Sequence, residues 1–314
     1  MLAPALLALL ALALAWPVPI VLSRSRWTRR SPAAALVLWQ AIAIAGGLSM
    51  IGALLTFGLA PYGADLFTGA VGFASSFTRP QPVEVVNVLA LAGAALLTTH
   101  LLLNLLLTVV RSERQRRRHA QLLLLLSSPH PSGSRLIDTP APVAYCLPGA
   151  LSSVTVVSAG LLELLDDDGM RAVIEHERAH VRQRHDVVLV LFRAWHSALP
   201  WFPIAYRAQQ EVGLLIELLA DDHARRSVED SVLATAIARV GAGRESAGAA
   251  ADRWADAASA DPLSARLARL DPAVRPLPRW AEAAIVACAA ALLAVPTVLL
   301  LLPSALAALA TLPR

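Results

Sequence analysis

Residues 170–186 read MRAVIEHERAHVRQRHD, and two of their histidines, His176 and His180, stand four residues apart. Helical residues at this spacing share one face, so both imidazoles can point at a single ion. Glu177 lies about 100° further round the helix, where it can reach a water molecule without being a ligand. This pattern is typical of zinc proteases, in which the glutamate is the general base. The alternative is a solvated helix face that carries these residues by chance.

A third protein ligand is expected in the stretch ELLADDHA at 217–224. Glu217 and Asp221 are four residues apart there and share a face. Glu217 would complete a set of two histidines and one glutamate, and would leave the fourth position of a zinc tetrahedron open for water. Asp221 would hold one imidazole through its free N–H. The alternative for Glu217 is a surface carboxylate, but its apolar neighbours would make an unpaired charge costly.

Three other histidines are rival ligands. The pattern over 164–200 predicts one long helix, on which His185 lies nine residues after His176 and therefore roughly 180° away from it. His196 returns to that face but lies about 30 Å along the helix axis. His223 is off the face of Glu217. We interpret these three histidines as structural or substrate-facing.

The composition places much of the chain in lipid. Hydrophobic residues make up 56% of the 314 residues and charged residues only 16%, against about 25% charged in soluble proteins. The net charge of +4 comes from arginines that cluster beside apolar segments. That arrangement indicates membrane orientation and argues against direct nucleic-acid binding.

Four apolar segments are long enough to span a bilayer, at residues 2–22, 33–59, 83–110 and 281–302. Nothing basic precedes the first segment, so we expect a retained span and not a cleaved signal peptide. The loops after the first and third spans are basic, whereas the loop near 61–82 is not. The basic residues are Arg24, Arg26, Arg29 and Arg30 in one loop and Arg111, Arg114, Arg116, Arg117 and Arg118 in the other. The positive-inside rule predicts a multi-pass plasma-membrane protein with its N-terminus outside and residues 111–279 in the cytoplasm. Residues 280–314 then form the fourth span and a short extracytoplasmic tail.

The cytoplasmic segment is long enough for one compact α+β core. Short β-branched stretches at 135–139, 143–150 and 153–162 predict strands of a small sheet. The long helix over 164–200 would begin at Asp166 and end at Pro200, followed by helices over 204–226 and 228–241. The Ala/Gly-rich stretch 241–262 is interpreted as a linker or a weak helix. The expected fold class is an integral membrane protein, mainly α, with this small sheet.

Several stretches together resemble the BlaR/MecR-type antirepressor membrane metallopeptidases, and more distantly the HtpX and CAAX-protease group. The resemblance covers 143–224 and the order of the spans. It rests on VAYCLPG, TVVSAGLL, VIEHERAHVRQRHD and ELLADDHA, and DPLSARLARL at 261–270 is a weaker echo of an arginine-containing segment of these families.

The resemblance implies a gluzincin-like domain in which Zn²⁺ is bound by His176, His180 and Glu217. Glu177 would be the base and Asp221 would support the site. Ala144 and Tyr145 would lie on the edge strand along which a substrate peptide is bound. Proteins of this type cut a cytoplasmic helix-turn-helix repressor, or induce its cutting, in response to an antibiotic.

The sequence departs from that family in two places. The family's sensors carry an extracellular penicillin-binding domain after the fourth span, whereas we expect none here because the stretch to Arg314 holds no S-x-x-K or K-T-G pattern. A separate sensor partner, a homo-oligomer or a metabolite would then supply the signal. Position 185 holds histidine where a polar residue, often aspartate, is expected.

Three functions remain open from the sequence. The first is a zinc endopeptidase in the bilayer that cuts a cytoplasmic protein, with a winged-helix repressor as the expected substrate, during antibiotic-response signal transduction. The second is a membrane protease of protein quality control with the same chemistry and broad substrates. The third is a non-catalytic membrane scaffold with a relict site, against which the intact set of His176, Glu177, His180 and Glu217 argues.

Overall fold

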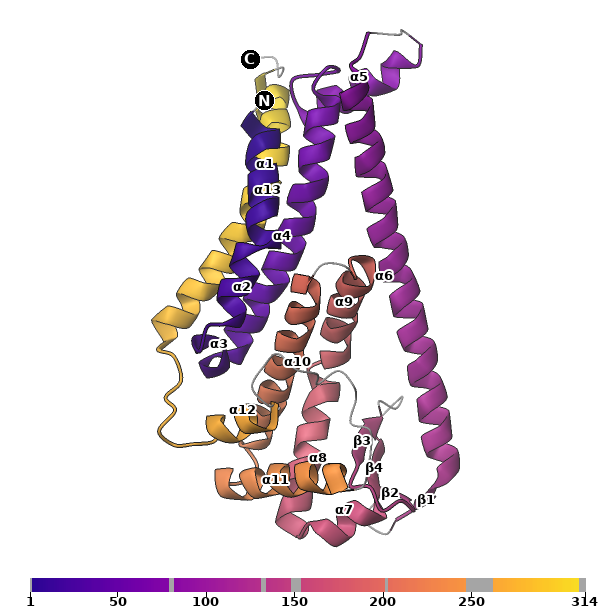
Figure 1. The fold of residues 1–314 in the computed structure, drawn as a ribbon, viewed down its shortest axis with the longest axis vertical. Helices are drawn as coiled ribbons and strands as arrows, with labels where there is room; N and C mark the ends of the chain where they lie inside the picture. Colours follow the sequence, from indigo (N-terminus) through magenta and orange to yellow (C-terminus); the bar gives the residue numbers. More distant parts are fainter. Residues whose placement is uncertain are drawn as a thin grey trace. The chain divides into compact units, whose positions relative to one another are not determined.

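The computed structural model describes residues 2–78, 82–130, 134–147, 154–200, 203–246 and 262–310. These residues are mainly helical and include one small four-stranded sheet (Figure 1). The chain divides into two compact units. The helical unit contains Met1–Ser25, Val37–Asn104 and Pro278–Arg314, and the mixed unit contains Arg26–Leu36 and Leu105–Leu277.

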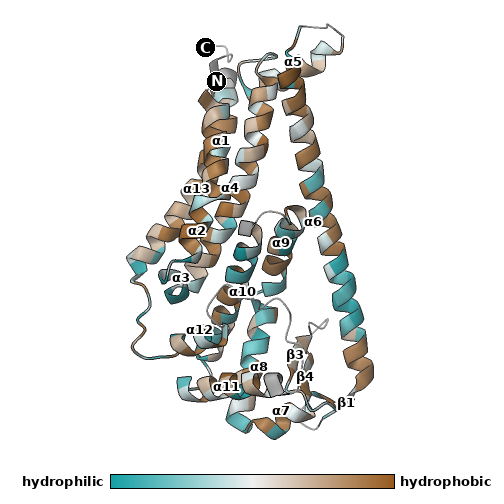
Figure 2. Cartoon of the chain, viewed as in Figure 1, coloured by the Kyte–Doolittle hydropathy of each residue, from teal (hydrophilic) through white to brown (hydrophobic). Residues whose placement is uncertain are grey.

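Helices occupy all four positions at which spans are predicted, and each is long and apolar enough to cross a membrane (Figure 2). They are α1 (Leu2–Ala15) with α2 (Pro17–Ser23), α4 (Pro32–Leu59), α6 (Val85–Leu126) and α13 (Arg279–Ala310). The sequence places the end of the third span at residue 110, but α6 continues for 16 residues beyond it. Arginine and leucine are good helix formers, so the basic run after residue 110 does not end the helix.

The ends of the shorter helices follow from local sequence. Helix α2 starts at Pro17, whose fixed φ suits the first turn of a helix. Helix α5 (Leu66–Ser76) is capped by Asp65, whose carboxylate accepts hydrogen bonds from the amides of Phe67 and Thr68. The Ser304 hydroxyl donates a further hydrogen bond to the same carboxylate at 2.6 Å and thereby fixes α13 to this cap inside the helical unit.

The sheet of the mixed unit has the strand order β1-β2-β4-β3. The strands are β1 (Ser127–Pro129), β2 (Arg135–Ile137), β3 (Ala144–Leu147) and β4 (Val154–Ser158). The β2–β4 pair is parallel and the other two pairs are antiparallel. Strand β3 is therefore an edge strand, and helix α8 packs beside it. The sequence predicts β2, β3 and β4 but not β1, because a three-residue strand carries no periodicity to detect.

Six helices complete the mixed unit, with the four-residue α3 (Trp27–Arg30). They are α7 (Ala159–Leu164), α8 (Asp167–Arg182), α9 (His185–Ala198), α10 (Pro203–Ala224), α11 (Asp230–Ser246) and α12 (Pro262–Arg269). A buried apolar core joins the sheet to α7, α8 and α11. Its most buried members include Leu161, Ala172 and Leu233, each at most 1% exposed.

The prediction of one long helix over 164–200 is wrong. Helix α8 ends at Arg182 and α9 begins at His185, because Arg184 takes a left-handed conformation with φ 49° and ψ 43°. Arg184 is the only non-glycine residue with positive φ in the described part of the chain. This conformation costs an L-residue about 1–2 kcal/mol, so tertiary contacts must favour the break.

The stretch 241–262 is only partly described. Residues 242–246 extend α11 beyond the predicted end at 241, residues 247–261 lie outside the described residues, and α12 begins at Pro262. Two arginines hold α12 against α10: Arg266 pairs with Asp221 and Arg269 with Asp222. Because Arg269 also donates to the carbonyl of Arg29, α3 is joined to the same end of the unit.

Candidate metal centre

Helix α8 carries the two histidines of the centre. The Asp166 carboxylate caps its first turn by accepting from the Gly169 amide at 2.8 Å, and the acidic residues that follow complement the helix dipole. Ala172, His176 and Ala179 form the buried face, so the first histidine projects inward and is 8% exposed. The helical spacing places His180 one turn further along the same side.

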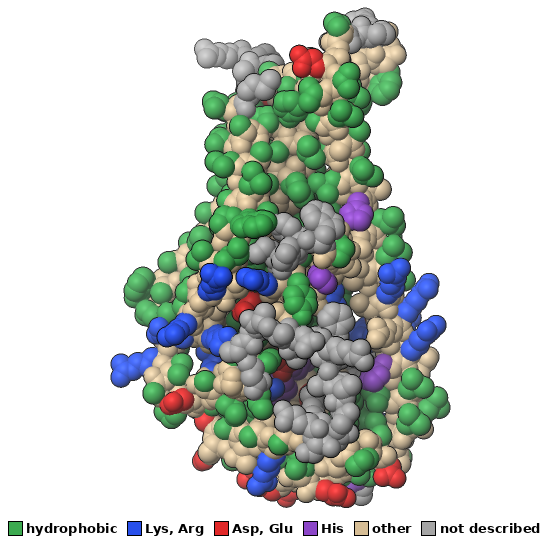
Figure 3. Space-filling model, viewed as in Figure 1, with side chains coloured by type: hydrophobic (Ala, Val, Ile, Leu, Met, Phe, Trp, Pro, Cys, Tyr) green, Lys and Arg blue, Asp and Glu red, His purple; other side chains and the backbone are tan. Residues whose placement is uncertain are grey.

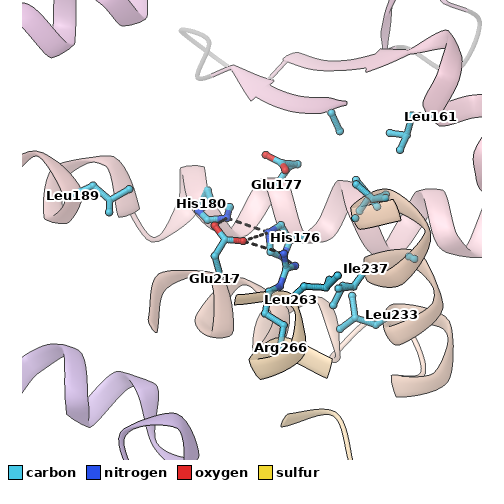
Figure 4. Close-up of a pocket in the computed structure, with 15 residues that line it drawn as sticks. Leu161, His176, Glu177, His180, Leu189, Glu217, Leu233, Ile237, Leu263 and Arg266 are labelled. Carbon is cyan, nitrogen blue, oxygen red and sulfur yellow. Dashed lines mark hydrogen bonds and ion pairs between the residues drawn. The ribbon is translucent and has the colours of Figure 1, made fainter. Parts of the chain in front are cut away.

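Helix α10 brings Glu217 to both imidazoles, as Figure 4 shows. The Nε2 atoms of His176 and His180 are 3.2 Å apart. A carboxylate oxygen of Glu217 lies 3.3 Å from Nε2 of His176, and its other oxygen lies 3.6 Å from Nε2 of His180. These three residues are the group that could hold a metal ion among the described residues. The sequence therefore named the three side chains that the fold brings together.

The distances between the nitrogen and oxygen atoms of these three residues can be compared with those in a zinc site. Bonds of about 2.0–2.1 Å in a tetrahedron place neighbouring ligands about 3.3–3.4 Å apart. The Nε2–Nε2 distance of 3.2 Å, and the distances of 3.3 and 3.6 Å from these two nitrogens to the two different oxygens of Glu217, lie close to that edge length. Two imidazoles and a carboxylate are also the donor types that catalytic zinc uses with one position left open. The residues present therefore fit a zinc ion.

Asp221 supports the first histidine, as its position one turn after Glu217 predicts. Its carboxylate is 2% exposed and accepts a hydrogen bond from Nδ1 of His176 at 2.8 Å. This bond keeps the proton on Nδ1 and leaves the Nε2 lone pair for a metal. Arg266 donates two further bonds to the same carboxylate, at 2.7 and 2.8 Å, so the buried charge is paired.

The charges around His176 shift the pKa values of His176 itself and of its partners Glu217 and Asp221. Burial lowers the pKa of His176, but the hydrogen bonds with Asp221 and Glu217 outweigh it and raise that pKa to about 9. Burial raises the pKa of Glu217, but the bond to His176 and the charge of Arg266 leave it below its ordinary value. The pKa of Asp221 is lowered by the same partners against its burial. Both carboxylates are thus ionised at neutral pH.

A different set of groups supports His180. The break at Arg184 turns His185 back, so that Nδ1 of His185 lies 3.0 Å from Nδ1 of His180. The carboxamide oxygen of Gln183 accepts from Nε2 of His185 at 2.9 Å. A neutral His185 with its proton on Nε2 must accept at Nδ1, so His180 donates from Nδ1 and keeps the Nε2 lone pair free. Burial is the main cause that lowers the pKa of His180 to about 4, and it lowers that of His185 too.

The position of His185 corrects the sequence interpretation. Counting along a continuous helix places this residue on the opposite side of α8 from His176. The left-handed Arg184 removes that constraint, and His185 contacts the second histidine although it is not part of the three-residue group. The other two rivals are not members of the three-residue group: the ring of His196 is tilted against that of Tyr206, and Nε2 of His223 lies 3.5 Å from the Arg182 guanidinium.

A cavity of about 390 Å³ opens at the centre. Glu177 points into it from α8, and Ala144 of the edge strand also lines it. Tyr145, the other residue expected on the substrate side, faces His119 of α6 with ring centroids 5.4 Å apart. Successive strand residues point to opposite faces, so only one of the two can line the cavity.

Arg266 is the one charged residue of this cavity that the sequence analysis did not assign. It comes from α12 and lies 3.3 Å from Glu217 as well as pairing with Asp221. Burial lowers its pKa, but the two carboxylates outweigh that and raise it, so Arg266 stays charged. The segment DPLSARLARL carried the signal, yet only the fold shows which of its two arginines reaches the centre.

The chain was compared with known proteins. Residues 110–271, just over half of the chain, match the model of peptidase family M48. No curated protein and no solved structure matches the chain. The matched range contains both helices of the centre, the edge strand and Arg266. The finer resemblance to antirepressor peptidases is not part of this match. The chain belongs to peptidase family M48.

Proposed function

We propose that the protein is a membrane-bound zinc endopeptidase that cuts a cytoplasmic protein. The observation that carries this proposal is the triangle of His176, His180 and Glu217, which opens into the cavity that Glu177 also lines. When bound there, zinc would supply Lewis-acid chemistry by polarising a carbonyl and lowering the pKa of a water molecule. The other parts of the reaction fall to the side chains of this chain.

Glu177 is the proton carrier in this proposal. Its carboxylate would accept a proton from the attacking water and pass it to the amine that leaves when the peptide bond breaks. Its place in the chain, directly after His176, keeps it on the cavity side without making it a member of the ligand triangle. Asp221 and His185 hold the two imidazoles, and so fix where the reacting groups meet.

Edge strand β3 is the proposed platform for the substrate. It lies beside α8, and its residue Ala144 lines the cavity. An extended peptide added to this edge would form backbone hydrogen bonds without demanding a particular sequence. A small side chain at position 144 leaves room for the peptide next to Glu177.

The charge pattern supports a cytoplasmic site. The basic stretches after the first and third spans point to the interior face of the plasma membrane, and the matched peptidase segment, residues 110–271, contains the second of these stretches. Figure 3 shows exposed arginine side chains on the viewed face, and arginine supplies all 27 basic Lys or Arg residues of the chain. A reporter enzyme that is active only outside the cell should be active when it is fused at residue 62 or after residue 310. A reporter that is active only inside the cell should be active when it is fused at residue 112.

The resemblance to antirepressor peptidases favours a helix-turn-helix repressor as the substrate, so that cleavage would switch genes on in an antibiotic response. A broad quality-control protease would use the same chemistry. The two are separated by comparing new protein N-termini in cells that carry the wild type or Glu177→Gln. One or a few cut transcription factors support the repressor, many unrelated cut proteins support quality control, and unchanged signalling by Glu177→Gln supports a scaffold.

The chemistry itself is tested with purified full-length protein in detergent. Glu177→Gln should retain one equivalent of zinc and lose cleavage of an unfolded protein by at least about 100-fold. Glu175→Gln is the matched control, because Glu175 is on the same helix but pairs with the exposed Arg178 and does not line the cavity. Equal activity of wild type and Glu177→Gln would refute the proposal.

A further inference from the structure

The cavity at the metal centre has two chemically different ends. Five of its 15 lining residues are ionisable, and they are the three residues of the triangle with Glu177 and Arg266. The other ten lining residues are apolar or glycine. We call the set Leu161, Leu233, Ile237, Val240 and Leu263 the apolar end. Figure 4 shows four of these residues grouped on one side of His176, whereas Leu189 lies on the other side beside His180.

The apolar end is part of the domain core. Leu161 and Leu233 are at most 1% exposed and Ile237 is 7% exposed. All three belong to the buried cluster, and Val240 and Leu263 pack against it. Close-packed core side chains hold their positions, so this end is a preformed wall. The five residues of this end are all apolar, and Arg266, which Figure 4 shows near Leu263, is already paired with Glu217 and Asp221.

We propose that the apolar end receives the substrate side chain next to the scissile bond and selects a large apolar residue there. This inference rests on the proposed peptidase function and names its substrate preference. Val240, Ile237 and Leu263 would be the specificity-determining residues. Leucine, isoleucine, methionine and phenylalanine fit this role, whereas glycine, aspartate and lysine do not.

The preference follows from desolvation. One methylene in a hydrophobic pocket changes kcat/KM by roughly 10–200-fold, and leucine has three more carbon atoms than alanine, so kcat/KM for leucine should exceed that for alanine by at least about 100-fold. A charged side chain would lose its hydration and find no partner among the five residues of the apolar end. The cavity volume of about 390 Å³ is near the lower limit of ligand sites, which suits one large side chain beside the reacting groups.

The edge strand supplies the geometry for this selection. Side chains of an extended peptide alternate between two faces, so a peptide along β3 would direct every second side chain toward α8 and the cavity. Ala144 on β3 and Leu161 at the start of α7 border the same cavity. The one side chain that enters it lies next to the ligand triangle, where the peptide bond would be cut.

The first test digests a denatured protein mixture with full-length, zinc-loaded protein in detergent and identifies the residues on both sides of each cut by mass spectrometry. We expect one flanking position to be enriched in large apolar residues. A flat profile, or enrichment in small or charged residues at both positions, overturns the inference while leaving the peptidase function intact.

Variants of Val240 make the test specific. Val240→Phe narrows the cavity and should shift the preferred residue to alanine or glycine, and Val240→Asp should raise cleavage next to lysine and arginine by at least about tenfold. Ala238→Phe is the matched control, since Ala238 is exposed on the same helix and should leave the profile unchanged. If Val240 variants do not fold, Leu263→Ala should enlarge the cavity and favour tryptophan. A wild-type profile in every folded variant overturns the inference.

A binding measurement separates this inference from the function. Amino-acid hydroxamates with leucine, alanine or aspartate side chains can be titrated against zinc-loaded Glu177→Gln. Tighter binding of the leucine compound by about tenfold or more supports the apolar end even if the wild type cuts nothing, in which case only the proposed function falls. Equal binding of all three compounds overturns the inference.

Discussion

The two imidazoles that face Glu217 are held in opposite ways. On one side a buried carboxylate, Asp221, accepts from His176 and is itself neutralised by Arg266. On the other side an uncharged imidazole, His185, lies against His180 and is oriented by Gln183. Both arrangements leave an Nε2 lone pair for the metal, but only the first places charge in the core.

This difference decides where a proton resides when no metal is bound. The carboxylate side raises the pKa of His176 to about 9, whereas burial outweighs the charge of Glu217 and lowers the pKa of His180 to about 4. His176 thus exchanges a proton for the metal ion, whereas His180 is already a neutral ligand. The comparison shows that two equivalent residues of one motif receive their properties from tertiary contacts.

Removing the charged support should have the largest effect. Asp221→Ala leaves Arg266 buried without its main partner and His176 without an acceptor, so we expect a loss of about 3 kcal/mol in the free energy of unfolding and about 100-fold in zinc affinity. Thermal unfolding and a competition titration with a chromophoric chelator measure both. Asp222→Ala, which removes the neighbouring pair with Arg269, should leave zinc affinity unchanged. Equal effects of the two variants would contradict the assigned role of Asp221.

The pH dependence of zinc binding should reveal the proton on His176. Because the pKa of this group is raised to about 9, the zinc-free protein carries the proton below that pH, and zinc must displace it. Apparent zinc affinity should therefore fall about tenfold for each pH unit below 9, down to the neutral range. Calorimetry in buffers of different ionisation enthalpy should detect about one released proton at pH 7. In Asp221→Asn the pH range over which zinc affinity falls should move to lower pH. An unchanged pH profile would mean that the displaced proton is not on His176.

Removing the neutral support should have a smaller effect. His185→Phe takes away the acceptor for His180 Nδ1, and zinc affinity should fall about tenfold. His185→Asp supplies another acceptor and should retain affinity within about threefold of the wild type. His223→Phe serves as the control because His223 has no contact with the centre. An affinity loss in His185→Asp as large as that in His185→Phe would mean that ring packing, and not hydrogen bonding, supports His180.

The smallest effect is expected at the break itself. Glycine adopts positive φ without the steric cost that Arg184 incurs, although it loses more chain entropy on folding. Arg184→Gly should therefore raise the free energy of unfolding by about 0.5 kcal/mol, and the β-branched Arg184→Val should lower it by about 1 kcal/mol or more. Chemical denaturation measures both. Zinc affinity of Arg184→Gly should stay unchanged, and a loss would show that the arginine side chain itself supports His185.

Much of the centre could be predicted because it depends on helix geometry alone. The four-residue spacings of His176 with His180, and of Glu217 with Asp221, fix which side chains share a face whatever the rest of the fold. The apolar spans follow equally from length and composition. His185 was misplaced because its position depends on one backbone conformation, that of Arg184, which no periodicity signals. Arg266 was not assigned because its partners are 45 and 49 residues away in the chain.

The sequence by itself determined the four apolar helices, most of the small sheet and the three side chains that could bind a metal. These features depend on local periodicity and on the burial of apolar surface, and short stretches of residues are enough to determine both. Only the tertiary structure decided which groups support each histidine, which arginine neutralises Asp221 and where the apolar end of the cavity lies. Those depend on contacts between α8, α10, α11 and α12, whose residues are far apart in sequence and meet only when the core packs.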